Sequence, residues 1–497
     1  MTVLHIAHPG PVERAAHGDE ARGATPLETH GSWKPADDRP DPVALLQEQN
    51  LTREPDLVPV RHGRMMVSPF TFYRGAARIM AADLSRTPVA GLEAQLCGDA
   101  HLSNFGVFAS PERRLMFDLN DFDETLPGPF EYDVKRMTAS FAIAARNNAF
   151  SKADVLATTM EAAASYRTAM ADFAHERTLD IWYAHLSEDE LMTSVRAAAD
   201  ALRRTGDGKK GKDKGKDKGK AKKDKSALTV DKQVQRVERS AEKAHSRDSL
   251  QALSKLGERV DGRYRIVSQP PIVVPARDLE QTYGISPEEI ERTVREQFRA
   301  YRATLQVDRR RLLERFEVVD FARKVVGVGS VGTRAFIVLL QGRDEADPLF
   351  LQVKEATTSV LEPYLRKSRF KQSGERVVQG QRMMQAASDI FLGWTKGADV
   401  TRAFYWRQLR DMKGSAVVEE MVPSGMKFYA RICGWTLARA HARSGDPVAM
   451  ASYLGSDDTF ERAITEFSLR YADQNDRDYD AFVQAVRSGR LSAVEGV

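Results

Sequence analysis

The sequence predicts a mixed α+β fold with two β-rich regions that lie far apart along the chain. Short apolar runs bounded by turn residues occur over residues 92–119 and recur over residues 321–421. Apolar residues repeat with helical spacing over residues 130–148, 151–175, 429–443 and 459–471. With 497 residues and 42% hydrophobic content, the chain can bury a sizeable core, and we expect two lobes with additional helices.

Composition and charge argue against several classes of protein. The net charge is +4, but residues 209–225 alone contain ten lysines and three aspartates, so the rest of the chain is slightly acidic. Two cysteines, Cys97 and Cys433, are too few for a disulfide framework. No apolar run is long enough to span a membrane, and residues 1–42 lack the apolar core of a signal peptide. We therefore expect a cytoplasmic protein without a membrane segment.

Proline content and charge divide the chain into six segments. Residues 1–45 are rich in proline and charged residues, and we expect a disordered arm there. The tract of lysine, glycine and aspartate over residues 206–226 is expected to be a solvated linker or insertion. Because no aromatic residues interrupt its lysines, we expect no nucleic-acid partner, and polyanion binding by this tract is the alternative. The other expected segments are part of a larger lobe (46–205), a helical segment (227–320), a β-rich smaller lobe (321–425) and C-terminal helices that complete the larger lobe (426–497).

An acidic loop lies between apolar residues in the stretch from Leu96 to Gly106. Asp99 follows a glycine in this stretch, and Asn104 comes five residues after Asp99. This spacing is typical of a phosphotransferase catalytic loop, in which the aspartate accepts the proton of the substrate hydroxyl and the asparagine holds a metal ion. His101 either orients the loop or acts as a base. A turn with side chain to backbone hydrogen bonds is the structural alternative.

A second acidic cluster follows a predicted hairpin over residues 107–119. Mg²⁺ needs hard oxygen ligands, and Asp121 is the expected carboxylate ligand beside Asn104. Asp118 and Asp123 are alternatives to Asp121, because an error of two or three residues would place either of them at the metal. The sequence therefore predicts an Mg²⁺ site between the two acidic segments.

Three glycines between two predicted strands form a candidate phosphate-binding loop. Their GxGxxG spacing opens a strand, whereas in a dinucleotide-binding fold it must open a helix. A third strand ends in a lysine, and this order is how a protein kinase covers nucleotide phosphates. An ordinary hairpin bend and a surface lysine are the structural alternatives. The residues expected to bind ATP are Gly327, Gly329, Ser330, Gly332 and Lys354.

Two further charged residues are candidates for the same site. Glu375, in a helix predicted over residues 361–384, is the expected partner of Lys354. Arg74 either points toward the acidic loops or a bound phosphate, or is a surface arginine at the start of a helix.

These motifs carry a resemblance to known families. Residues 98–104 resemble the GDxHxxN loop of the aminoglycoside and choline phosphotransferases, which belong to the protein-kinase-like superfamily. From Leu57 to the C-terminal helices, the chain also resembles the bacterial family called domain of unknown function 2252. Residues 57–75, 96–106 and 117–133 carry this second match. The resemblance implies a protein-kinase-like fold and leaves the reaction open.

The chain departs from the phosphotransferase pattern in two ways. Cys97 occupies the position where those enzymes usually have histidine. The glycine loop and Lys354 come more than two hundred residues after Asp99, whereas the usual kinase places them first. If both assignments hold, the fold is circularly permuted, with its new connections on the surface.

The expected function is ATP-dependent, Mg²⁺-requiring phosphoryl transfer to a hydroxyl group. By analogy with the resembling families, the unknown acceptor is a small molecule. Nucleotidyl transfer on the same scaffold and a catalytically inactive, nucleotide-binding regulatory protein are the alternatives.

Overall fold

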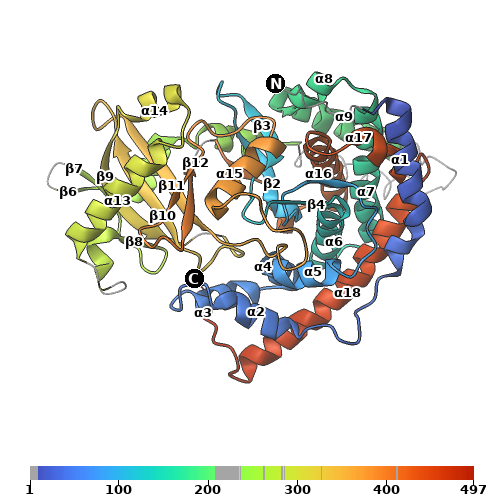
Figure 1. The fold of residues 1–497 in the computed structure, drawn as a ribbon, viewed down its shortest axis with the longest axis horizontal. Helices are drawn as coiled ribbons and strands as arrows, with labels where there is room; N and C mark the ends of the chain where they lie inside the picture. The colour runs from blue at the N-terminus through green and yellow to red at the C-terminus, as the bar shows by residue number, and fades with distance from the viewer. Residues whose placement is uncertain are drawn as a thin grey trace, which may run out of the picture.

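Antiparallel sheets occupy one region of the molecule and long helices occupy another (Figure 1). The computed structural model describes residues 9–496 apart from residues 208–233, 236, 261–262, 281–283, 285, 326 and 410–411. Within this part, the expectation of a mixed α and β protein is confirmed. The tract expected to be a linker lies largely outside the described residues.

A six-stranded antiparallel sheet forms the core of what we call the sheet region, in the order β12-β13-β11-β10-β9-β8. Its strands are β8 (Val273–Pro275), β9 (Glu317–Lys324), β10 (Ala335–Gln341), β11 (Pro348–Ala356), β12 (Gly393–Lys396) and β13 (Ala403–Gln408). A two-stranded ribbon, β6 (Gly257–Val260) and β7 (Arg263–Ile266), lies beside it. The sheet therefore begins within the segment that was expected to be helical.

Helices cover both faces of this sheet. Val338 and Leu340 of β10 pack against α13 (Pro287–Arg302), whereas the alternating Ile337 and Leu339 pack against α11 (Ser249–Leu256). This alternation follows from the period of two in a β-strand. The register pairs Lys354 of β11 with Ala335 of β10 and with Tyr405 of β13, so the lysine is fixed in the centre of the sheet.

Four long helices form the core of the helical region: α6 (Glu131–Asn147), α7 (Lys152–His175), α16 (Pro423–Ala442) and α18 (Thr459–Arg487). A smaller sheet, in the order β14-β2-β3-β5, lies beside them, and β1 pairs with β4. The bounds are β1 (Glu93–Leu96), β2 (Phe105–Ala109), β3 (Leu115–Leu119), β4 (Leu126–Pro129), β5 (Leu186–Ser187) and β14 (Gly414–Ser415). The predicted hairpin over residues 107–119 is confirmed as β2 and β3, although β2 begins two residues earlier, at Phe105.

The other helices of the described chain are mostly shorter. They are α1 (Pro11–Ala24), α2 (Pro42–Asn50), α3 (Val58–Met65), α4 (Pro69–Gly75), α5 (Ala77–Leu84), α8 (Thr178–Tyr183), α9 (Glu188–Asp207), α14 (Val307–Leu313), α15 (Ser373–Met384) and α17 (Pro447–Leu454). The helix expected over residues 361–384 begins only at Ser373. Residues Tyr364 and Leu365 lie in turns before it and pack against the core of the helical region.

The expectation of a disordered arm over residues 1–45 is wrong for the described residues of that segment. Helix α1 packs against α17, as Figure 1 shows at the edge of the helical region. Arg39 forms ion pairs with Asp83 at 2.7 Å and with Asp478 at 2.6 Å. Trp33 packs against Tyr471 with their ring centroids 5.1 Å apart. Partners more than four hundred residues away supply the stability that local composition lacks.

The protonation of the buried His30 side chain can be used to test whether these N-terminal residues belong to the folded core. Its Nε2 lies 2.7 Å from the Tyr453 hydroxyl. Burial, with the positive charge of Lys135, lowers the pKa of His30 from 6.5 to about 3. The unfolded chain therefore takes up a proton as the pH falls through 6.5, whereas the folded chain resists protonation down to about 3. Neutral His30 thus stabilises the fold above pH 6.5, and this contribution is lost as the pH falls.

The substitution His30→Gln is expected to make the free energy of unfolding less sensitive to acid. Between about pH 6.5 and 4, the slopes for wild type and variant should differ by up to about 1.4 kcal/mol per pH unit. Urea titrations over this range measure the difference. His17→Gln, on the exposed face of α1, is the control and should match wild type. Equal slopes for His30→Gln and wild type would mean that the N-terminal segment is not packed as described.

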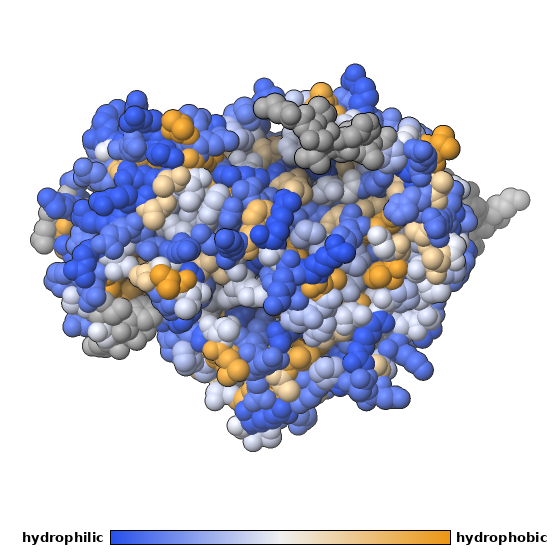
Figure 2. Space-filling model, viewed as in Figure 1, coloured by the Kyte–Doolittle hydropathy of each residue, from blue (hydrophilic) through white to orange (hydrophobic). Residues whose placement is uncertain are grey.

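The surface gives no indication of a membrane-spanning element. Among the described helices, none combines the length and the apolar character that crossing a bilayer requires. Figure 2 shows a largely hydrophilic face on which apolar side chains form small, separate groups. The surface feature that gives the most information about function is a charged cleft.

Candidate active site

A cleft of about 1080 Å³ is lined by both the sheet region and the helical region. Its walls come from distant parts of the chain, which are residues 48–53, 74–78, 99–104, 121–124, 327–334 and 352–363, with additional side chains from 371–373 and 396–407. Most of the residues predicted to be functional lie on these walls. The cleft is therefore the candidate active site.

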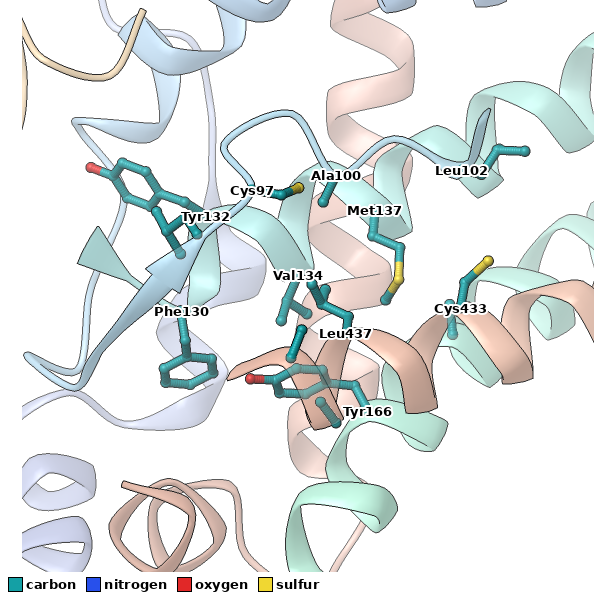
Figure 3. Close-up of a cluster of buried hydrophobic side chains, with 14 of the residues drawn as sticks. Cys97, Ala100, Leu102, Phe130, Tyr132, Val134, Met137, Tyr166, Cys433 and Leu437 are labelled. Atoms are coloured by element: carbon teal, nitrogen blue, oxygen red, sulfur yellow. The ribbon is translucent and has the colours of Figure 1, made fainter. Parts of the chain in front are cut away.

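The backbone of the loop that carries Asp99 is held in place by neighbouring residues packed against it. Gly98 has a φ of +82°, and a Cβ atom there would lie 2.3 Å from the carbonyl oxygen of Glu124, so only glycine fits. The Asp133 carboxylate accepts hydrogen bonds from the backbone N–H groups of Cys97 at 2.7 Å and Gly98 at 3.0 Å. Figure 3 shows Cys97 and Ala100 on the loop beside the buried side chains of α6. Cys97 thus serves as a small buried side chain where the resembling enzymes have histidine.

The Asp99 carboxylate faces the cleft, and one of its two oxygens accepts a hydrogen bond. Arg136 of α6 donates from Nε to Oδ1 of Asp99 over 2.7 Å, and its own side chain is only 3% exposed. Burial raises the pKa of Asp99 above its ordinary value, although the charge of Arg136 opposes the shift. Asn104 donates from Nδ2 to the backbone oxygen of Asp99 over 2.7 Å, which closes the loop.

His101 is a buried neighbour of Asp99. Its Nε2 lies 3.7 Å from Oδ2 of Asp99, beyond hydrogen-bonding distance, and the residue is 4% exposed. Burial, together with the positive charges of Arg136 and Arg74, places the pKa of His101 well below its ordinary value. A neutral imidazole in this position favours the interpretation that His101 orients the loop.

Lys354 meets the second acidic segment, which follows directly after β3. Its Nζ lies 2.6 Å from Oδ2 of Asp123 and 3.7 Å from Oδ1 of Asp121. Tyr405 of β13 donates to Oδ1 of Asp123 over 2.6 Å. Burial opposes ionisation of Asp123, but the charge and hydrogen bond of Lys354 outweigh it and lower its pKa. In contrast, Oδ1 of Asp121 is buried without a hydrogen-bond partner.

The glycine loop closes the cleft between β9 and β10. Arg53 donates to the backbone oxygens of Val331 and Gly329, and the N–H of Glu54 donates to the backbone oxygen of Gly332 over 2.7 Å. Gly332 has a φ of +87°, which favours glycine there. On the opposite side, Ser330 donates from Oγ to Asp123 over 3.3 Å. The loop is therefore tied both to the N-terminal segment and to the second acidic segment.

Three of the residues considered in the sequence, Gly332, Glu375 and Asp118, do not line this cleft. Gly332 faces the side chain of Arg53 instead. Glu375 lies on α15, but it does not line the cleft, and the ion-pair partners of Lys354 among the described residues are Asp121 and Asp123. Asp118, considered as an alternative to Asp121, points into the core, where it pairs with Arg439 at 1% exposure of either side chain. The pairing expected for Glu375 is therefore not formed.

Three arginines of the site were missed from the sequence. Arg376, next to the predicted Glu375, donates to the backbone oxygens of Asp123, Thr125 and Thr357 and so fixes the second acidic segment. The other two are Arg53 and Arg136. Single arginines in mixed sequence give no local signal, although the helical period of residues 130–148 places Arg136 one turn after the helix start.

A comparison with family models gives the chain a place among known sequences. Residues 53–216 and 186–485 match the model described as "Uncharacterized protein conserved in bacteria (DUF2252)". The chain belongs to this family. No curated protein and no solved structure matches the chain. The residues of this DUF2252 protein that form the acidic loops, the glycine loop and Lys354 all lie within the matched ranges.

The donor atoms of the cleft in this DUF2252 protein fit Mg²⁺ held together with a phosphate. In the described part of the chain, no three side chains of His, Cys, Asp or Glu converge into a metal site. Mg²⁺ is usually bound by one or two carboxylates, with substrate phosphates and water completing the octahedron. Oδ1 of Asp121 accepts no hydrogen bond and lies 3.7 Å from Nζ of Lys354, so it is an acceptor of the right kind, and Asn104 lines the same cleft.

Proposed function

We propose that this protein is an ATP-dependent, Mg²⁺-requiring phosphotransferase with a protein-kinase-like, circularly permuted fold, acting on a hydroxyl group. One observation carries the proposal. Lys354 follows Asp99 and Asp121 by more than two hundred residues, yet all three line one cleft, and Lys354 contacts the second acidic segment directly. An ordinary hairpin bend with a surface lysine would not produce this arrangement.

The sheet region would hold the phosphates of the nucleotide. A Cβ atom at Gly327 would have no neighbour within 4 Å, so the backbone there is open to a phosphate that approaches closely. Lys354 is 3% exposed, and its ammonium group would neutralise phosphate oxygens. Asn104 and Asp121 would hold Mg²⁺, which would supply positive charge that offsets the charge of the phosphates.

The helical region would activate the acceptor. With Oδ1 held by Arg136, the Asp99 carboxylate can accept the proton of the acceptor hydroxyl on Oδ2. The hydroxyl oxygen would form a bond to the γ-phosphorus of ATP while the bond to the bridging oxygen breaks, and ADP would leave with the electron pair. The raised pKa of Asp99 brings it closer to the range in which a general base is effective.

The arrangement of the two regions supports a kinase-like fold with a permuted order. In protein kinases a glycine loop and a strand lysine precede the catalytic loop, whereas here β9, β10 and β11 follow it. Helix α15 packs beside β12 and β13, the place of a helix that would supply a glutamate to the lysine. Here Arg376 of α15 donates to the backbone oxygen of Asp123, and the carboxylate partners of Lys354 come from the second acidic segment.

The proposal predicts that Mg-ATP raises the melting temperature of the full chain and that ATP with a chelator does so less. Labelled ATP then identifies the reaction, because transfer of the γ-phosphoryl group releases ADP and nucleotidyl transfer releases pyrophosphate. Pyrophosphate as product would replace the phosphotransferase proposal by its alternative. If no nucleotide changes the melting temperature, both the enzyme and its inactive nucleotide-binding form are contradicted.

A further inference from the structure

The positively charged side chains that line the cleft differ in whether they have ion-pair or hydrogen-bond partners within the protein. Lys354 is paired with Asp123 at 2.6 Å, and Arg334 and Arg402 are paired with Glu355 at 3.3 and 2.7 Å. Arg53 holds the glycine loop as described above. These side chains are already engaged, so they give little indication of a missing ligand.

Arg74, in the last turn of α4, is different. It lines the cleft and is partly buried, yet within the described part of the chain its guanidinium group makes no hydrogen bond and no ion pair. Its Nε atom is fully buried, and the ring of Phe70 lies 6.0 Å from the guanidinium carbon. Removing a guanidinium group from water without an anionic partner is costly, so this position favours a bound anion.

Arg78 lines the same cleft from the next helix, α5. It forms an ion pair with Glu48 at 2.7 Å, and 57% of the Glu48 side chain is exposed. The Nε atom of Arg78 is also buried without a hydrogen-bond partner. Arg74 and Arg78 therefore give the cleft two guanidinium groups with unused N–H donors, and arginine binds oxyanions through such donors.

The position of Arg74 connects this part of the cleft to the reacting groups. Arg74, Asp99 and His101 line the same cleft. Burial lowers the pKa of Arg74, and the negative charges of Glu419 and then Asp99 oppose this shift, while the charge of Arg74 helps to lower the pKa of His101. The backbone of Arg74 also touches the glycine loop, since a Cβ atom at Gly329 would lie 3.3 Å from the Arg74 carbonyl oxygen. An anion bound here would lie beside the acceptor hydroxyl.

We propose that Arg74 and Arg78 form an oxyanion site beside Asp99 for the acceptor, which is therefore a hydroxy compound that also carries a phosphate or carboxylate group. This inference rests on the proposed phosphotransferase function. A cationic acceptor would be repelled by the two guanidinium groups. The site therefore separates this protein from the aminoglycoside phosphotransferases that its catalytic loop resembles.

The first experiment measures anion binding directly. Inorganic phosphate is titrated by calorimetry into the full chain saturated with Mg²⁺ and a non-hydrolysable ATP analogue. Phosphate should bind wild type, and Arg74→Gln should weaken it about tenfold or more, because a hydrogen bond to a charged group is lost. Arg78→Gln should weaken it less, because Arg78 also pairs with Glu48. The affinity for the analogue should stay within about threefold in both variants.

A matched control and a conservative variant make the result interpretable. Lys396→Gln removes an exposed cation from the same cleft and should leave phosphate binding unchanged. Arg74→Lys keeps the charge but loses the paired donors, and it should give an intermediate affinity. If Arg74→Gln melts well below wild type, the other variants decide the result.

Three outcomes separate this inference from the function on which it rests. If phosphate does not bind beside the analogue, the proposed acceptor site is wrong. If Arg74→Gln weakens binding of the analogue instead of phosphate, Arg74 contacts the nucleotide, and the acceptor site is again wrong. If phosphate binding depends on Arg74 but the analogue does not bind, the anion site stands and the proposed function fails. In a screen for ADP release, anionic alcohols should be turned over with a KM that Arg74→Gln raises. Turnover of neutral or cationic alcohols with an unchanged KM would overturn the inference.

Discussion

Replacing Asp99 with Asn is expected to reduce phosphoryl transfer by about 100-fold or more while changing Mg-ATP affinity by less than about threefold. The asparagine keeps the shape of the side chain but removes the group proposed to accept the proton of the acceptor. The proposed nucleotide contacts come mainly from Lys354 and the glycine loop, which this substitution leaves in place. Release of ADP measures turnover, and the shift in melting temperature with Mg-ATP measures binding.

The stability of the Asp99→Asn variant needs its own control. The substitution leaves the buried guanidinium group of Arg136 without its carboxylate partner at 2.7 Å, so the protein without ligand should melt at a lower temperature. Arg136→Lys keeps a cation beside Asp99 and should lose much less turnover than Asp99→Asn. Full turnover by a folded Asp99→Asn protein would mean that another group accepts the proton.

The elements that local sequence specifies were predicted correctly. The hairpin of β2 and β3 has short apolar runs on both sides of the turn at Ser110–Arg113, and both strands form with the expected pairing. Helices α6 and α7 follow from apolar spacing, and Ser151 caps α7 through its side chain. In these segments propensity, pattern and tertiary packing all favour the same structure.

The elements that were missed depend on distant partners. The arm expected over residues 1–45 has the composition of a disordered segment, yet Arg14 pairs with Asp446 at 2.6 Å and α1 packs against α17. Nothing near Arg14 in the sequence indicates that partner. The tertiary contacts, which pattern analysis does not contain, therefore decide the structure of this segment.

The candidate site shows the same division between local and distant information. The acidic loops and the glycine loop have recognisable spacing, and the structure places them in one cleft. The residues that orient them have no motif: Arg136 holds Asp99, and Arg376 holds the segment around Asp123. Glu375 was chosen because a kinase pairs its lysine with a helix glutamate, but here two aspartates occupy that role.

Asp123 links the two regions of the molecule. Its carboxylate receives Lys354 and Tyr405 from the six-stranded sheet and Ser330 from the glycine loop, while its backbone oxygen accepts from Arg376. The contacts with Lys354, Tyr405 and Ser330 cross from this acidic segment to the sheet region. They favour a structural role for Asp123, and Asp121 is then the carboxylate proposed to bind Mg²⁺.

This division of roles predicts different effects for two neighbouring substitutions. Asp121→Asn is expected to abolish the rise in melting temperature with Mg-ATP. The Asp121 carboxylate, whose Oδ1 accepts no hydrogen bond, is the group proposed to hold Mg²⁺. The melting temperature without ligand should change little, since Lys354 keeps its partner at 2.6 Å. Differential scanning fluorimetry with and without Mg-ATP gives both values.

Asp123→Asn is the matched control, with the same chemical change two residues away. It leaves the buried Lys354 with the more distant Asp121 at 3.7 Å, so it should lower the free energy of unfolding without ligand by about 3 kcal/mol. The folded fraction should still respond to Mg-ATP. If instead Asp121→Asn responds to Mg-ATP like wild type and Asp123→Asn does not, Asp123 holds the metal. The ion pair with Lys354 would then have to open when the nucleotide binds.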